Sequence, residues 1–340
     1  MPRAARELVA LSQRGVDPTA LRESIVGPLQ RLVGAGPVFV ASADPTTWLF
    51  TGATSRDVPA PAQPLFLANE FGQDDVTKFR HLATSRSPVG SLFQGTDGRP
   101  AASSRWRDVI EPLGWGDELR VALRVDGRTW GFLCLHRESG DEAFTKADVE
   151  RLAPVLPHLA AGFRRTSLAS RTPSSATTPL GPGVVLLDDE GNLVSATGSA
   201  AAWLHDLQPM PAAELPLAIL GLAAQVRSGD DTSVLRLRSG RGGWVALHGG
   251  LLDGPGPARV AVVMEAAGVE LTLPMLSATV GLTPREVDVT AAVLRGESTR
   301  TIATRLHISE YTVQTHLKSI FDKTGVRSRR ELVGCVLAGR

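Results

Sequence analysis

Residues 282–337 read LTPREVDVTAAVLRGESTRTIATRLHISEYTVQTHLKSIFDKTGVRSRRELVGCVL, and this stretch carries the strongest structural signal in the chain. Thr283, Pro284 and Glu286 are typical of a helix start. A threonine N-cap, a proline at the first helical position and a glutamate three residues after the cap all stabilise a first turn. Gly296 follows the apolar positions of this helix and predicts its end. The stretch therefore opens with one well-capped helix.

Three more helices are predicted after this one. Ser298 is the expected N-cap of a short helix, and a turn at 307–309 separates that helix from a longer one that ends near Gly325. A capping box that starts at Ser328 begins a fourth helix, at about 329–338. A short helix, a tight turn and a longer helix in this order indicate a helix-turn-helix unit.

The longer helix has two chemically different faces. Val313, Leu317 and Ile320 share one face at helical spacing, and we expect them to pack on the preceding helices. The opposite face carries Tyr311, Gln314, Thr315 and Lys318. Glutamine, threonine and lysine can all contact base edges, so we predict that this face reads the major groove of double-stranded DNA. The alternative is a structural bundle with a solvated basic face. The agreement of caps, turn spacing and exposed face over about 55 residues favours DNA binding.

The motifs LTPRE, IATRL, ISEYTV, HLKSIFDK and GVRSRREL make residues 282–337 resemble the LuxR/FixJ class of DNA-binding domains. The resemblance implies base contacts by Gln314, Thr315 and Lys318, although Gln314 stands where the family often has lysine, which predicts a different operator preference. It implies that a second set lies near phosphates or positions the helix: Arg300, Ser309, Thr312, His316 and Lys323. It implies dimer contacts on the fourth helix, made by Leu332, Val333 and Val336. A homodimer on a two-fold symmetric operator follows.

The amino-terminal region mixes helix and strand. Apolar spacing predicts helices near 8–11 and 21–33, and Asp126-Gly127 is a strong hairpin signal between two apolar strands. A helix is expected over 144–163, with Thr145 as its N-cap. The stretches LRVALRVDGRTWGFLCLHR and FTKADVERLAPVLPHLA resemble a GAF-type sensor domain over roughly residues 20–165. That resemblance implies an α+β fold that binds a small ligand or mediates dimerisation.

The middle region begins GVVLLDDEGNLVSATGSAAAWL, which predicts a strand, a turn, a second strand and a helix. Three more strands are expected at VLRLR, WVALHGGLL and ARVAVVMEA. The order resembles a PAS domain of reduced size. The preceding stretch, RTPSSATTPLGPG at 171–183, is rich in Pro, Ser, Thr and Gly, so we expect an extended, mobile linker.

The expected organisation is therefore multidomain. It comprises an α+β GAF-like sensor domain at 1–168, a linker at 169–182, a small α+β PAS-like domain at 183–267, a connecting helix at 268–280 that Pro274 interrupts, and an all-α four-helix helix-turn-helix domain at 281–340.

Composition limits the class of protein. The chain has 340 residues, 43% apolar and 21% charged, with a net charge of +1, as in ordinary globular proteins. Residues 281–340 hold ten basic and six acidic side chains, so the net charge of this end is +4 and that of the remainder of the chain is −3. This distribution suits phosphate contact at one end only. No apolar run is long enough to span a bilayer, the amino terminus lacks a signal-peptide core, and the two cysteines lie far apart, so we expect a cytoplasmic chain without disulfides or membrane contact.

Regulation by a small-molecule effector is the favoured hypothesis for the amino-terminal region. The residues predicted to line a pocket are Phe66, Phe71, Phe79, Phe93, Trp106 and Trp130. For any one of these aromatics taken alone, plain core packing is the favoured interpretation. A protein-interaction and dimerisation platform without a ligand is the alternative for the region as a whole.

Other function classes are disfavoured. Asp188 and Asp206 suggest the acidic positions of a phosphorylated receiver, but they are too close together to enclose its helices and strand. The sequence holds no phosphate-binding glycine loop and no nucleophile elbow, so we expect no enzyme and no catalytic residue. No spaced Cys/His set predicts a metal, and lone histidines such as His136 and His158 assign no haem, so no cofactor is expected.

The sequence thus predicts a sequence-specific DNA-binding transcription regulator, controlled by a small-molecule or protein signal at its GAF-like and PAS-like regions. The expected partners are double-stranded DNA, a second copy of the chain and an effector, with RNA polymerase as a further candidate.

Overall fold

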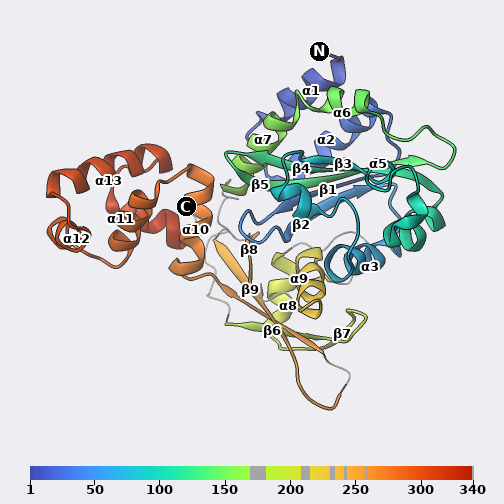
Figure 1. The fold of residues 1–340 in the computed structure, drawn as a ribbon. Coiled ribbons are helices and arrows are strands. Elements are labelled where there is room, and N and C mark those ends of the chain that lie inside the picture. Colours follow the sequence, from blue (N-terminus) through green and yellow to red (C-terminus); the bar gives the residue numbers. More distant parts are fainter. Residues whose placement is uncertain (169–180, 208–214, 230–233, 241–242, 257–258, 339–340) are drawn as a thin grey trace.

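The computed structural model describes residues 1–168, 181–207, 215–229, 234–240, 243–256 and 259–338. Two five-stranded sheets and a group of carboxy-terminal helices make up the molecule (Figure 1). Most of the predicted linker at 169–182 lies outside the described residues. None of the helices in the described ranges is both long and apolar enough to cross a membrane.

The amino-terminal sheet is antiparallel, with the order β2-β1-β5-β4-β3. Its strands are β1 (Val38–Ala43), β2 (Phe50–Arg56), β3 (Val89–Ser91), β4 (Trp115–Val125) and β5 (Arg128–Glu138). The predicted turn between β4 and β5 is confirmed, because Asp126 and Gly127 both have positive φ, at 51° and 72°, as a type I′ hairpin requires.

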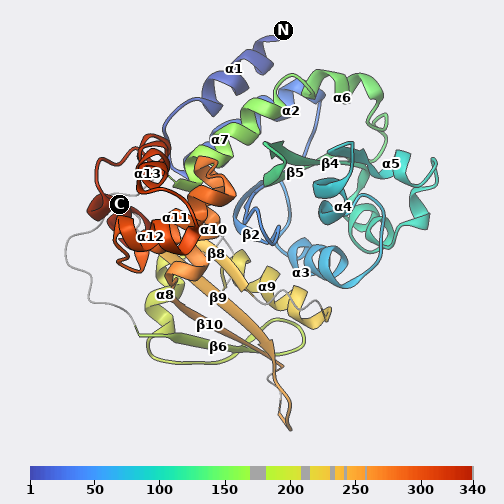
Figure 2. The same ribbon diagram turned by 60° about the vertical axis from the view of Figure 1, so that its left-hand side comes forward.

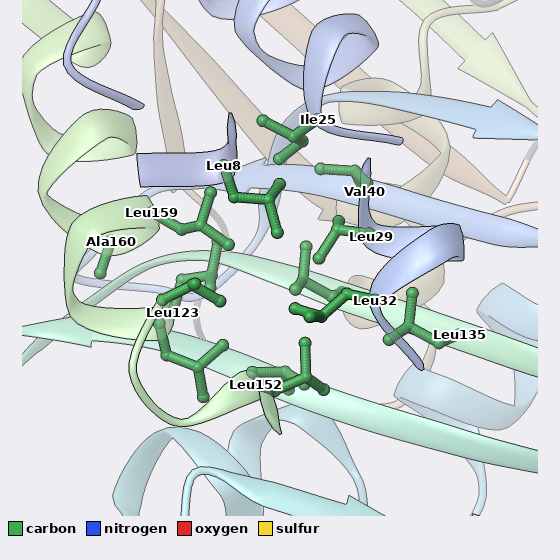
Figure 3. Packing of buried hydrophobic residues seen from close by; sticks show 14 of the residues in the cluster. Leu8, Ile25, Leu29, Leu32, Val40, Leu123, Leu135, Leu152, Leu159 and Ala160 are labelled. Carbon is green, nitrogen blue, oxygen red and sulfur yellow. The ribbon is translucent and has the colours of Figure 1, made fainter. Parts of the chain in front are cut away.

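Four helices cover one face of this sheet: α1 (Arg3–Ser12), α2 (Pro18–Val33), α6 (Lys146–Leu152) and α7 (Leu156–Leu168). Figure 3 shows how Leu8, Leu29 and Leu159 from three of these helices meet β-strand side chains in this core. The capping box of Thr145 and Asp148 is confirmed. The prediction of a single helix over 144–163 is wrong. Two helices, α6 and α7, form instead, and they are separated at 153–155, where Pro154 lacks a backbone N–H donor.

Short helical segments cover the opposite face and the sheet edge. They are α3 (Ala62–Leu67), α4 (Phe79–Thr84), α5 (Leu92–Gly95), π-helical turns at Ala68–Gly72 and Trp106–Ile110, and 3-10 turns at Pro100–Ala102 and Glu111–Leu113. Together with the sheet, these segments confirm the expected α+β class for this domain.

The middle domain contains a second antiparallel sheet, of order β7-β6-β10-β9-β8. Its elements are β6 (Gly183–Leu187), β7 (Leu193–Ala196), α8 (Ala200–Asp206), α9 (Leu217–Arg227), β8 (Val234–Arg238), β9 (Trp244–Leu251) and β10 (Val260–Ala266). Figure 2 shows α9 between the two sheets. Leu222 packs in the middle core whereas Leu217 and Ala224 pack in the amino-terminal domain, so the two domains share this helix.

The carboxy-terminal helices are α10 (Val269–Val280), α11 (Pro284–Leu294), α12 (Thr299–Leu306), α13 (Glu310–Thr324) and α14 (Arg329–Ala338). The predicted four-helix arrangement after residue 281 is confirmed. The interruption expected at Pro274 is wrong, because α10 continues through this proline. Burial of Leu273, Met275 and Leu276 on either side of it explains why the helix tolerates one lost hydrogen bond.

Gly131 on β5 offers a test of packing in the amino-terminal domain. A Cβ at this position would lie 2.5 Å from the carbonyl oxygen of Ala41 and 2.6 Å from the Phe163 ring. We therefore expect Gly131→Ala to lower the free energy of unfolding by about 1–3 kcal/mol, because neither backbone nor ring can easily move away. Chemical denaturation measures this. Gly72→Ala is the matched control, since a Cβ there has no neighbour within 4 Å. Equal stability of the two variants would contradict this packing.

Candidate nucleic-acid interface and ligand cavity

Helix α13 is positioned by its cap and by its buried face. The Ser309 hydroxyl accepts a hydrogen bond from the Thr312 amide at 3.0 Å, and Gly325 ends the helix with a φ of 73°. Val313, Leu317 and Ile320 are buried in the core of the carboxy-terminal helices. The predicted packing face is therefore confirmed.

The opposite face of α13 is open to solvent. Tyr311 is 82% exposed, and Gln314, Thr315 and Lys318 are all exposed. Gln314 Nε2 donates to Thr299 Oγ1 at 3.3 Å, while the Thr315 hydroxyl donates to the carbonyl oxygen of Tyr311 at 3.1 Å. With its hydroxyl turned back to the helix, Thr315 can offer its methyl group outward.

Lys323 links α13 to the start of α11. Its Nζ lies 2.6 Å from Glu286 Oε2 and donates to the carbonyl oxygen of Gly281 at 3.1 Å. Glu286 also accepts from Ser319 Oγ at 2.7 Å and from the Thr283 amide at 2.7 Å, which completes the predicted capping box. Lys323 is thus engaged in positioning the helix. Burial raises the pKa of Glu286, but the hydrogen bonds from Lys323, Ser319 and Thr283 outweigh it and hold the pKa at about 2.

The remaining residues predicted near phosphates differ in exposure. Arg300 is exposed on α12, Ser309 is exposed at the start of α13, and Thr312 and His316 are half-buried. Whether they approach phosphates stays a prediction.

Two residues that the sequence did not single out help to hold Gln314. Arg329 Nη2 donates to Thr299 Oγ1 at 2.7 Å, and the same hydroxyl accepts from Gln314. Arg329 Nη1 also donates to the carbonyl oxygen of Glu297 at 2.9 Å. These residues lie up to 32 positions apart, so no local pattern could have found them.

The assignment of dimer contacts to α14 requires a correction. Leu332 and Val336 are 0% and 1% exposed, because they pack in the domain's own core with residues of α10 and α11. They stabilise this domain and are not available to a second copy. Val333 is half-buried, and its part in a dimer stays a prediction.

The six aromatic residues that were predicted to line one pocket lie in different parts of the fold. Phe79 stacks on Phe132 with ring centroids 4.5 Å apart, and Phe50 contacts both rings, so this part of the sheet face is filled. Phe71 and Phe79 border a small cavity of about 130 Å³. Phe93 is 39% exposed, and Trp106 packs in a separate small cluster with Leu92, Ile110 and Trp115. The prediction that all six share one pocket is wrong.

Phe66 and Trp130 do line a large cavity, of about 690 Å³. The amino-terminal domain contributes Phe39 and Arg22, the middle domain contributes Arg236 and Trp244, and α10 contributes Met275. A volume of this size suits a small organic molecule. The cavity therefore joins the amino-terminal domain, the middle domain and the helix that leads to the carboxy-terminal domain.

A buried ion network borders this cavity. Glu118 Oε2 lies 2.7 Å from Arg105 Nε and 3.0 Å from Arg120 Nε, and Arg120 Nη1 lies 2.6 Å from Glu70 Oε2. Burial raises the pKa of Glu118, but Arg105 and Arg120 outweigh it and hold the pKa at about 2. The buried Lys78 ammonium donates to the carbonyl oxygens of Asn69 and Gln73, and these hydrogen bonds stabilise the loop before α4.

Among the described residues, the one group with donors close enough for a metal is Glu118, Cys134 and His136, whose ligand atoms lie within 4.8 Å of one another. No local Cys/His spacing predicts this group, since its members meet only through the pairing of β4 and β5. The Cys134 thiol donates to Glu118 Oε1 at 2.8 Å, and burial raises its pKa well above the usual range. Burial likewise lowers the pKa of His136 to about 4. Since Arg105 and Arg120 already occupy the other Glu118 oxygen, the site favours a neutral thiol over a cation.

Two family models match the chain. Residues 280–336 match the bacterial regulatory proteins of the luxR family, and residues 17–161 match the GAF domain. The carboxy-terminal domain is therefore a luxR-type helix-turn-helix domain, and the amino-terminal one is a GAF domain. Neither match extends over residues 183–267.

Individual relatives share only parts of the chain. The nitric oxide reductase transcription regulator NorR1 of Cupriavidus necator is 27% identical over 161 residues, which are 46% of this chain and 28% of that protein. The putative HTH-type transcriptional regulator Rv0890c of Mycobacterium tuberculosis is 50% identical over 52 residues, 15% of this chain and 6% of that protein. The chain thus spans well under a third of these relatives.

Among solved structures, Escherichia coli SdiA aligns with 98% of this chain and 96% of its own, at 14% identity and a TM-score of 0.32. The cyanobacteriochrome TePixJ GAF domain covers 46% of this chain and 94% of its own, at 16% identity and a TM-score of 0.34. Both TM-scores are too low to establish a shared fold.

The contacts of Glu286 make a prediction about pH. The pKa of this carboxyl is lower in the folded protein than the usual value near 4.3, so its stabilising effect is complete above about pH 4.5 and is lost as the pH falls toward 2. We expect Glu286→Gln to lower the stability of the helix-turn-helix domain by about 1–3 kcal/mol at neutral pH and to flatten its decline in acid. Thermal unfolding at a series of pH values measures both effects. Glu310→Gln, an exposed residue of α13, is the control and should follow the unsubstituted protein. An unchanged acid profile for Glu286→Gln would contradict this role.

Proposed function

We propose that this protein is a sequence-specific, DNA-binding transcription regulator whose affinity for its operator is controlled by a small molecule in the 690 Å³ cavity. The open face of α13 carries the DNA-binding part of the proposal, because its side chains are exposed while the rest of the helix is firmly packed. The function of the whole chain is inferred from its domains.

The exposed side chains suit readout of base edges. Gln314 can form two hydrogen bonds with adenine, and the outward methyl group of Thr315 suits contact with thymine. Lys318 supplies the cation for guanine or phosphate. Arg300 and Lys318 add positive charge on neighbouring helices of the same domain. We propose that Gln314, Thr315 and Lys318 contact bases and that Arg300 contacts the backbone.

Helix α10 offers a route from the cavity to the DNA-binding domain. Met275 lines the cavity, Leu276 is buried in the carboxy-terminal core, and Ala278 is buried in the core of the GAF domain. A ligand that displaces Met275 must therefore move a helix that both domains hold. We propose that this movement sets the relative position of two helix-turn-helix domains in a homodimer on a two-fold operator.

We propose that the middle domain is a PAS-like module. Its strand order, β7-β6-β10-β9-β8, repeats the second-first-fifth-fourth-third order of the GAF sheet. It provides Arg236 and Trp244 to the cavity wall and shares α9 with the GAF domain. RNA polymerase is a further proposed partner, reached through an unassigned surface.

The second candidate function is a dimerisation and protein-interaction platform without a ligand. The stacked pair of Phe79 and Phe132 favours it, because these rings fill the sheet face where a pocket was expected. The separate cavity around Phe66 and Trp130 favours the ligand-controlled function.

Substitution of Lys318 tests whether the exposed face of α13 binds DNA. We expect Lys318→Ala to weaken operator binding by about 1–3 kcal/mol, by an amount that depends on the base pair opposite position 318. Binding measured on a set of operator variants at fixed salt gives this dependence. Arg330→Ala, an exposed substitution on α14, is the control and should leave the preference unchanged. A uniform loss over all operators would make Lys318 a phosphate contact, and no loss at all would contradict the proposed face.

The full chain and a chain lacking residues 1–267 test control by the sensor region. We expect the shortened chain to bind operator DNA with an affinity that no effector changes, because it lacks the cavity. Equal binding by both chains, with no response to any small molecule, would contradict the ligand-controlled function and favour the platform.

A further inference from the structure

Arg22 on α2 is a buried cation without a partner of opposite charge. It is 6% exposed. Of the three buried arginines in the described ranges, Arg105 and Arg120 form ion pairs with carboxylates, whereas Arg22 forms none. Its Nη1 donates to Ser42 Oγ and its Nη2 to Thr19 Oγ1, both at 2.9 Å. Hydroxyl oxygens satisfy hydrogen bonds but leave the charge uncompensated.

The nearest acidic residues, Asp17 and Glu23, also line the cavity, but neither forms a described ion pair with Arg22. Asp17 caps α2 by accepting from the amides of Thr19 and Ala20, and Glu23 is exposed to solvent. Burial lowers the pKa of Arg22 to about 10 even though Asp17 and Glu23 oppose the shift. The guanidinium is therefore still charged at neutral pH.

The guanidinium lies at the wall of the large cavity and keeps one donor free. Arg22, Ser42 and Gly52 all line the 690 Å³ space, and no described group accepts from Arg22 Nε. A Cβ at Gly52 would lie 3.2 Å from Arg22 Nη2, so the glycine on β2 leaves room for the guanidinium. A buried charge in the wall of a cavity, without a described counter-ion, is the arrangement expected of a group whose counter-ion is a ligand.

The other residues of the cavity wall indicate the chemistry of the remainder of that ligand. Trp130 and Phe163 line the same cavity and belong to the same core as the buried residues of α2, so the part of a bound molecule beside Arg22 would contact apolar rings. An inorganic anion would leave this surface uncovered, whereas a neutral apolar molecule would leave Arg22 unpaired.

We propose that the cavity binds a small amphipathic organic acid, whose carboxylate pairs with Arg22 and whose apolar body lies against Trp130 and Phe163. This inference rests on the proposed ligand-controlled function and specifies the chemical class of the effector. It also assigns Arg22, which no sequence pattern singled out, to the ligand site.

Octanoate and octanamide, which differ in charge but hardly in size, are the probes for the full chain. We expect calorimetry in chloride-poor buffer to give an affinity for octanoate at least about tenfold above that for octanamide. Arg22→Met should bind the two probes equally, and Arg22→Lys should retain a preference for the acid. Arg31→Met is the matched control, because Arg31 lies on the same helix but is exposed and should leave the preference intact.

Failure to bind octanoate, an equal affinity for both probes, or a preference that survives Arg22→Met would each overturn the proposal. Operator binding by the same variants without a probe is measured in parallel. Failure of the unsubstituted chain to bind operator DNA, measured alongside, would contradict the proposed function, whereas the probe affinities judge the acid site alone.

The stability of the ligand-free protein gives a second test that needs no ligand. An unpaired buried charge is unfavourable, so we expect Arg22→Met to be at least as stable as the unsubstituted protein in chemical denaturation. Arg120→Met should be much less stable, because it removes the ion pair of the buried Glu70 and leaves Glu118 with Arg105 alone. A clear loss of stability in Arg22→Met would show that Arg22 already has its partners and would overturn the proposal.

Discussion

Burial of one helix, α10, on several sides is the constraint that joins the parts of this protein. Leu276 lies in the core of the helix-turn-helix domain, and Ala278, two residues later, lies in the core of the GAF domain. Met275, beside them, faces the large cavity. Because packed cores leave few voids, this helix cannot shift without losing contacts in one domain or gaining them in the other. Such a helix suits two discrete positions better than a continuous range.

Helix α9 imposes a similar constraint on the two sheets. Its residues are buried almost all around, with Leu222 against the middle sheet and Leu217 against the aromatic cluster of the GAF domain. A helix that is apolar on every side needs two partners to cover it. The GAF and middle domains therefore form one structural unit, and the cavity between them belongs to both.

Charge inside this unit is distributed unevenly. Arg105 and Arg120 lie against Glu118 and Glu70, so their burial is compensated within the chain. Arg22, on the other side of the cavity wall, has only hydroxyl partners. Burial and the neighbouring Glu118 raise the pKa of Cys134 and keep it protonated, while Arg22 is a buried charge without a described carboxylate partner. The uncompensated charge thus lies at a residue that local sequence patterns do not single out.

The amino-acid sequence was sufficient to predict most features that depend on local contacts. Caps at Thr145, Thr283 and Ser298, the Asp126-Gly127 turn and the two faces of α13 depend on residues within a few positions of one another, and all were predicted. The local signals also misled in places, because Pro154 divides an expected helix whereas Pro274 does not, and burial accounts for the difference at Pro274.

Long-range packing settled the rest. The large cavity, the trio of Glu118, Cys134 and His136, and the burial of Leu332 all arise from segments distant in sequence. Aromatic residues illustrate the limit, since Phe66 and Trp130 line the cavity but Phe79 fills a core and Phe93 lies at the surface. Composition marks such side chains as apolar, and only the pairing of strands and the docking of α9 and α10 assign each one its neighbours.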